Sequence, residues 1–161
     1  MAGVGEALAG EFQDLSAAQA VQFTVRLLVA GLIGGVIGWD RERAGKSAGL
    51  RTFILVALGS AALVAVPQQA GMDTAAVSRV LQGLITGIGF IGAGCILKRD
   101  DEGHVRGLTT AAGVWLTAAA GVTAGMGREL SALLLGALGW STLAVLGRLE
   151  RQLPGDPKSR G

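Results

Sequence analysis

The distribution of charge along the chain is the feature that most constrains its fold. Charged residues make up only 16% of the 161 residues, against about 25% in an ordinary soluble domain, and they gather between long uncharged runs. A helix needs about 20 apolar residues to cross the hydrocarbon core of a bilayer. Five runs meet this requirement. The sequence therefore predicts an all-α integral membrane protein with transmembrane helices over residues 17–39, 50–66, 80–97, 107–126 and 130–147.

Two helix ends carry a specific chemical signal. Ser16 followed by Gln19 predicts a capping box at the start of the first span, in which each side chain bonds to the backbone N–H of the other residue. Pro67 is predicted to end the second span, because proline has no backbone N–H and its ring clashes with the preceding turn.

The basic residues predict the orientation, because Lys and Arg are retained on the cytoplasmic side of a membrane. Only Arg79 and Arg128 lie in the second and fourth loops. The first and third loops with their edges and the C-terminal segment hold Arg41, Arg43, Lys46, Arg51, Lys98, Arg99, Arg106, Arg148, Arg151, Lys158 and Arg160. We therefore predict residues 1–16 as a short extracytoplasmic segment, 17–147 as the transmembrane domain and 148–161 as a disordered cytoplasmic tail.

Glycine is unusually abundant, with 27 residues, more than twice the usual share of roughly 7%. Small residues let membrane helices approach closely. Gly83, Gly87 and Gly94 fall on one stripe of the third span, which predicts that this helix is central. Other small-residue pairs spaced by four are Gly31 with Gly35, Gly34 with Gly38, and Gly121 with Gly125. The G-x-G-x-x-G match at 87–92 lies inside a span, so it is not a dinucleotide site.

Four sets of motifs, in order and each at the edge of a span, resemble the MgtC/SapB family of bacterial membrane proteins. They are RLLVA at 26–30 with GWDRER at 38–43, GLRTF at 49–53 with LVALG at 55–59, Arg79 with GIGFIGAG at 87–94, and VRGLTTAA at 105–112 with Trp115. Two positions depart from the family: Phe53 stands where a histidine is usual, and Gln82 stands one position before the expected glutamine. The chain resembles the short, membrane-only branch of the family.

This resemblance implies a multi-pass protein of the bacterial inner membrane, linked to growth in low magnesium, to acid stress and, in pathogens, to virulence. It leaves two classes of function open. The first is a non-enzymatic protein that acts through helix contacts, as a homodimer or with another membrane complex such as the rotary ATP synthase. The alternative is a transporter or channel for magnesium or another small solute. We favour the first class, because no acidic residue lies inside a predicted helix core.

Charged residues at or within the spans are the first candidate site. Asp40 and Glu42 at the end of the first span are candidate ligands for Mg²⁺, which prefers carboxylate oxygens, although alternating charges there favour structural ion pairs. Arg26 lies inside the first span, where a charge is costly. It is predicted to snorkel outward, to bond to a backbone carbonyl, or, as we favour, to pair with an acid. The candidate acids are Asp14, Asp73 and Glu129.

The remaining candidates belong to the family motifs or to the edges of the spans. We expect interaction roles for Arg41, Arg51, Arg79, Gly87, Gly89, Gly92, Gly94, Arg106, Thr109 and Thr110. Cys95 is expected to be a small buried residue, and His104 a loop residue rather than a metal ligand. No combination of residues predicts catalysis or a resident cofactor beyond the possible Mg²⁺. Membrane lipid is an expected partner and nucleic acid is not, because the basic residues are explained by topology.

Overall fold

The computed structural model describes residues 3, 10, 15–98, 105–147 and 149. Most of the predicted tail, most of the N-terminal segment and the loop with His104 lie outside the described residues. The elements are α2 (Ala17–Arg43), α3 (Leu50–Gln69), α4 (Thr74–Gly94), β1 (Leu97–Lys98), β2 (Val105–Arg106), α5 (Leu108–Gly125), α6 (Glu129–Ser141) and the π-helix η1 (Thr142–Leu146).

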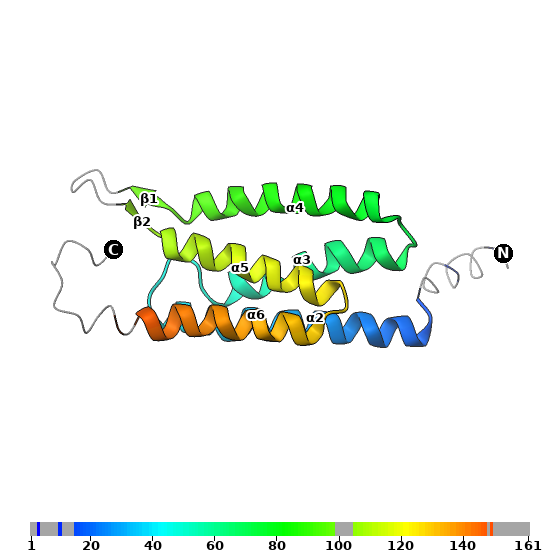
Figure 1. The fold of residues 1–161 in the computed structure, drawn as a ribbon, viewed down its shortest axis with the longest axis horizontal. Helices are drawn as coiled ribbons and strands as arrows, with labels where there is room; N and C mark the ends of the chain where they lie inside the picture. The colour runs from blue at the N-terminus through cyan, green and yellow to red at the C-terminus, as the bar shows by residue number, and fades with distance from the viewer. Residues whose placement is uncertain (1–2, 4–9, 11–14, 99–104, 148, 150–161) are drawn as a thin grey trace.

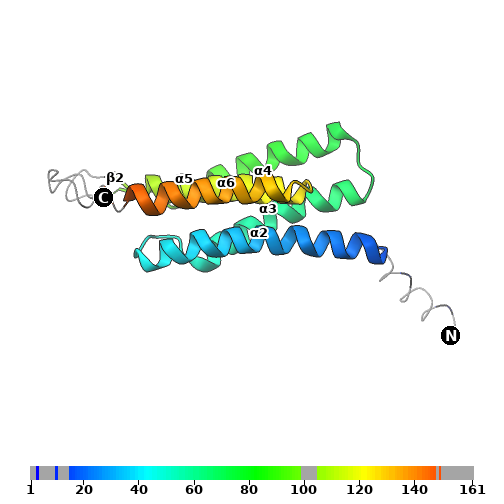
Figure 2. The same ribbon diagram turned by 60° about the horizontal axis from the view of Figure 1, so that its bottom comes forward.

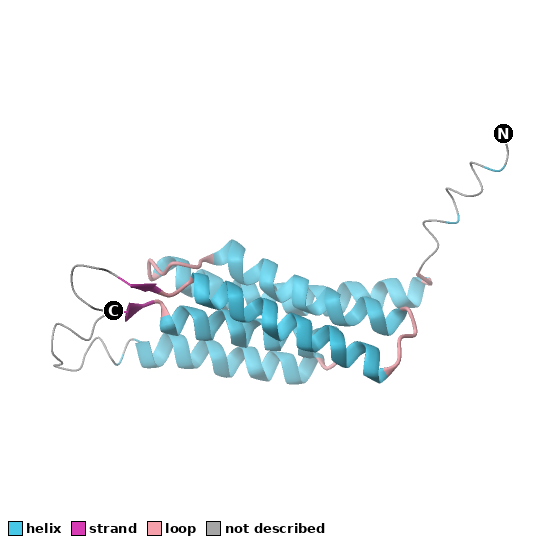
Figure 3. Ribbon diagram, turned by 90° about the horizontal axis from the view of Figure 1, so that it is seen from above, coloured by secondary structure: helices cyan, strands magenta, loops and turns pink. Residues whose placement is uncertain are grey.

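The helices form an elongated bundle in which each runs back alongside its predecessor (Figures 1 and 3). Among the described residues, five helices, with α6 and η1 counted as one, are long and apolar enough to cross a membrane, which confirms the five predicted spans. The loop between α2 and α3, the β1–β2 hairpin and the end of η1 lie at one end of the bundle. The start of α2 and the turn between α3 and α4 lie at the other end.

The helix ends agree with the sequence prediction at some places and differ at others. The capping box of Ser16 and Gln19 is confirmed, with both reciprocal bonds present. The prediction that Pro67 ends the second span is wrong, because α3 continues to Gln69 with Pro67 buried inside it. Proline has no backbone N–H to donate, so near the end of a helix its presence costs only one backbone hydrogen bond. The other bonds of that turn are kept, including the one from Ala70 N to Val66 O.

The third span is displaced along the sequence from its predicted position. α4 begins at Thr74 rather than near residue 80, because the side chain of Asp73 accepts a bond of 2.6 Å from Ala76 N and caps the helix. It ends at Gly94 rather than at residue 97. Leu97 instead pairs with Arg106 in the antiparallel β1–β2 hairpin.

Glycine permits the closest backbone contacts in the bundle. A Cβ added at Gly34 would lie 2.6 Å from the carbonyl oxygen of Phe53, and α2 therefore packs directly on the backbone of α3. Gly121 and Gly125 bring α5 against α3 in the same way, at the carbonyls of Ala57 and Ala61. Helices α3 and α5 consequently form the centre, and 50% of the apolar stretch of α5 is buried.

The third span, α4, is not central, so that prediction is wrong. Only 11% of its apolar stretch is buried, and Figure 2 shows it diverging from the other helices. Its buried residues are Val77, Ile88 and Gly92, whereas a Cβ added at Gly83 or Gly87 would meet nothing within 4 Å. The spacing of glycines identifies a face that can be approached closely. It does not identify the helix that approaches it.

Candidate functional site

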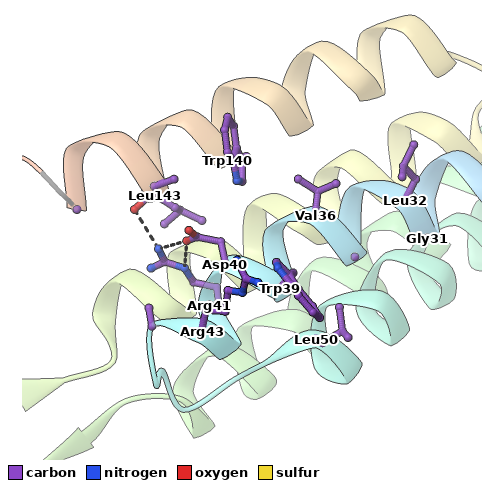
Figure 4. Close-up of a pocket in the computed structure, with 14 residues that line it drawn as sticks. Gly31, Leu32, Val36, Trp39, Asp40, Arg41, Arg43, Leu50, Trp140 and Leu143 are labelled. Atoms are coloured by element: carbon purple, nitrogen blue, oxygen red, sulfur yellow. Dashed lines mark hydrogen bonds and ion pairs between the residues drawn. The ribbon is translucent and has the colours of Figure 1, made fainter.

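The polar residues that end α2 line a groove between this helix and the chain's last helices, α6 and η1 (Figure 4). The groove has a volume of about 830 Å³. Charged side chains line one end of it, and glycine, aliphatic and tryptophan residues form the rest. Its lining residues are Gly31, Leu32, Gly35, Val36, Trp39, Asp40, Arg41, Arg43, Ala44, Leu50, Trp140, Leu143, Ala144 and Gly147.

Arg41 joins the two sides of this groove. It is only 5% exposed, and its Nη2 donates to Asp40 Oδ2 at 2.6 Å and to the carbonyl oxygen of Leu143 at 3.0 Å. Asp40 thus neutralises a buried guanidinium on its own helix, and Leu143 supplies an acceptor from η1. The group holds the end of α2 to the last helix of the bundle.

Glu42 has a different partner, although it lies only two residues after Asp40. Its Oε2 accepts a bond of 2.8 Å from Leu50 N, the first residue of α3. The N-cap residue Gly49 has no side chain to cap that helix, so Glu42 supplies the missing acceptor, and its charge suits the positive end of the helix dipole. The described residues contain no group of three His, Cys, Asp or Glu that could hold a metal ion. The magnesium site at Asp40 and Glu42 therefore stays a prediction.

Arg43 lies at the open rim of the groove. Its guanidinium carbon is 4.7 Å from the centre of the Trp39 ring, a cation–π distance. Both side chains are exposed, and Arg43 forms no ion pair with any residue that the structure describes. Its positive charge is therefore not neutralised within the described bundle.

Arg26 lies toward the other end of α2 and bonds to helix termini rather than to an acid. Its Nη1 donates to the carbonyl oxygen of Gly125 at 3.0 Å and to Gln68 Oε1 at 3.4 Å. The turn after α5 uses the carbonyls of residues 122–124 for its own bonds, which leaves the carbonyl of Gly125 for Arg26. Gly127 makes room for the guanidinium, since a Cβ there would lie 2.7 Å from Arg26 Nη2.

The prediction that Arg26 pairs with an acid is therefore wrong for the two candidate acids that the structure describes. Asp73 and Glu129 form no ion pair with Arg26, because Asp73 caps α4 and Glu129 lies in the first turn of α6. Asp14 lies outside the described residues. The alternative of a backbone carbonyl as partner is confirmed by the bond to Gly125.

The other predicted residues are spread over the bundle. Arg51, Arg79, Arg106 and Thr109 are exposed, and Thr110 is buried. Cys95 is buried, as expected, at the end of α4. Three of the family glycines in α4 have open space around them: Gly87, Gly89 and Gly94. A Cβ added at Gly92, in contrast, would lie 3.8 Å from the Cβ of Ala111.

Phe53, which stands where the family usually has a histidine, is fully buried. Its ring lies against Gly113, and a Cβ added there would be 3.5 Å from Phe53 Cε1. The same side chain also fills the space beside Gly38. In this chain the position therefore serves the packing of α2, α3 and α5.

Sequence reasoning missed the partners that the bundle supplies to the two arginines. The carbonyls of Leu143 and Gly125 carry no sequence signal, because every residue has one. Trp140 at the groove is different, since tryptophan near the end of a span is a known marker of the membrane interface. That signal was available in the sequence.

Five apolar helices with charged residues gathered at their ends define a multi-pass membrane protein. The chain belongs to the MgtC family, whose sequence profile matches residues 27–152. Protein SrpB of Synechococcus elongatus is 47% identical over 137 residues, which are 78% of this chain and 75% of SrpB. No solved structure gives a significant match.

Two further relatives are longer than this chain. YhiD of Escherichia coli K12, by its name a candidate magnesium transporter, is 42% identical over 113 residues, 66% of this chain and 52% of YhiD. Protein MgtC of Salmonella typhimurium is 40% identical over 112 residues, 69% of this chain and 46% of MgtC. The match therefore spans about half the length of these two relatives.

Proposed function

We propose that this chain is a non-enzymatic protein of the bacterial inner membrane whose exposed α4 face binds another transmembrane helix, in a role linked to magnesium limitation and acid stress. One observation carries the proposal. Gly83, Gly87 and Gly94 share a face of α4, and an added Cβ at each would meet nothing within 4 Å. Phe90, on the same side, is 83% exposed.

The destabilising effect of glycine on a helix supports the proposal that α4 has a partner. Glycine in a helix interior destabilises it by roughly 0.5–1 kcal/mol relative to alanine, and elsewhere in this bundle glycines such as Gly34 and Gly121 permit helix contact. The glycine stripe of α4 has no such contact within the described chain. A second helix packed on it would gain close van der Waals contact, the main source of helix association in lipid.

A second copy of the chain is the first partner that we propose, because two-fold dimers are the commonest oligomers. Another membrane complex, such as the rotary ATP synthase, is the alternative partner. The magnesium-linked role is supported by membership of the MgtC family and by the name of YhiD.

Substitution of Gly87 by leucine tests the α4 face. We expect Gly87→Leu to weaken co-purification of two differently tagged copies, or of the captured partner complex, by about tenfold, equivalent to about 1.4 kcal/mol. The matched control is Gly59→Leu on α3, where an added Cβ would also meet nothing within 4 Å. A wild-type protein that stays monomeric at all concentrations, with nothing captured by crosslinking in native membranes, would contradict the proposal.

Transport of magnesium or another small solute is the second candidate, and the name of YhiD is what favours it. Against it, Asp40 and Glu42 are engaged with Arg41 and with Leu50 N. Magnesium uptake by vesicles that contain the purified protein, above that of empty vesicles, would reverse our order of preference.

We also propose the orientation with the N-terminus outside and the C-terminus inside the cytoplasm. Its support is that the loop between α2 and α3 and the β1–β2 hairpin lie at one end of the bundle, and that both segments carry basic residues in the sequence. Reporter fusions after residues 46, 73, 103, 128 and 158 should read inside, outside, inside, outside and inside. A cytoplasmic signal at residue 73 would show that the orientation is reversed or the spans are miscounted.

A further inference from the structure

The groove between α2 and η1 has walls of two kinds. Arg41, Arg43 and Asp40 form one end, and the rest is made by Trp39 and Trp140 and by glycine and aliphatic residues. The contact between α2 and α3 does not require glycine at position 35, since an added Cβ would make only an ordinary contact, at 3.9 Å, with Ile54. The two helices therefore leave an open apolar groove beside a charged end.

The length of the groove matches one leaflet of a bilayer. Its lining runs along α2 from Gly31 to Arg43, which at 1.5 Å per residue is about 18 Å. Half of a hydrocarbon core of about 30 Å is roughly 15 Å, so the groove is about as long as one leaflet is thick. A lipid acyl chain has this reach and lies in this direction.

The charge at one end of the groove determines which lipid headgroup would bind there. Of the three charged groups that line the groove, Asp40 neutralises Arg41, and Arg43 forms no ion pair with any residue that the structure describes. Trp39 lies beneath the guanidinium of Arg43, which leaves the donors of Arg43 available to a phosphate. Trp39 and Trp140 mark the level of the headgroups, where tryptophan is enriched, and Figure 4 shows Trp140 pointing from α6 toward α2.

We propose that this groove is a binding site for one anionic phospholipid, with its phosphate on Arg43 and an acyl chain along Gly31 and Gly35. The bound lipid would fill the space between α2 and η1 and complete the packing of the last helix. This site is separate from the glycine face of α4, so the two proposals can succeed or fail independently.

Quenching of tryptophan fluorescence by brominated lipids tests the site. The protein carries Trp115→Phe, which leaves Trp39 and Trp140, and is placed in phosphatidylcholine vesicles with increasing brominated phosphatidylglycerol or brominated phosphatidylcholine. We expect phosphatidylglycerol to bind about fivefold more tightly, a difference of about 1 kcal/mol. Arg43→Gln should abolish this preference, and Lys46→Gln, an equal charge change at an exposed residue outside the groove, should leave it unchanged.

A second variant tests the apolar part of the groove. Gly35→Leu should reduce quenching by both lipids, because its side chain would occupy the groove while its Cβ makes only ordinary contact with Ile54. Equal binding of the two lipids by the wild-type protein would overturn the proposal. An equal loss of preference in Arg43→Gln and Lys46→Gln would also overturn it, because it would indicate general surface charge.

Discussion

Gly121→Ala is expected to destabilise the centre of the bundle strongly. The added methyl group would overlap the carbonyl oxygen of Ala57 and lie 3.0 Å from Ser60 Cβ. Because the first of these is backbone, relief requires α3 and α5 to move apart. Overpacking of this kind costs about 1–3 kcal/mol and sometimes more, and we expect about 3 kcal/mol here, seen as a large drop in the melting temperature in mild detergent.

The same substitution at Gly83 is the matched control. An alanine Cβ there would meet nothing within 4 Å, and alanine is the better helix former by up to about 1 kcal/mol. Gly83→Ala should therefore be neutral or slightly stabilising for the single chain. Equal effects of Gly121→Ala and Gly83→Ala would contradict the contact between α3 and α5.

Arg41→Met should produce the second large loss of stability. The variant leaves the Asp40 carboxylate, whose side chain is 21% exposed, without its partner and removes the bond to the Leu143 carbonyl. Breaking a buried ion pair by removing one member costs about 3–5 kcal/mol. Thermal or denaturant unfolding in detergent, followed by circular dichroism, measures this loss.

Two variants separate the ion pair from the loss of a charge in general. Arg51→Met removes an exposed arginine and should change stability by no more than about 0.5 kcal/mol. Asp40→Asn combined with Arg41→Met removes both charges, so it should recover part of the stability lost in Arg41→Met. A double variant no more stable than Arg41→Met alone would indicate that the Leu143 bond and side-chain packing carry the effect.

The number and nature of the spans could be predicted because the bilayer acts on each segment separately. A helix in lipid must satisfy its own backbone groups and present about 20 apolar residues, and both properties are local. The capping box at Ser16 and Gln19 is local too, because its bonds join residues three apart. The family motifs were recognisable for the same reason, as ordered runs at the edges of the spans.

What the tertiary structure decided is which surfaces and charges meet. Glycine stripes on α4 and α5 look alike in the sequence, yet Gly121 lies against α3 while Gly87 faces open space. Arg26 was predicted to pair with an acid and instead bonds to the carbonyl of Gly125, 99 residues away in the chain. Burial and pairing are set by contacts between distant segments, and no residue's neighbours along the chain specify them.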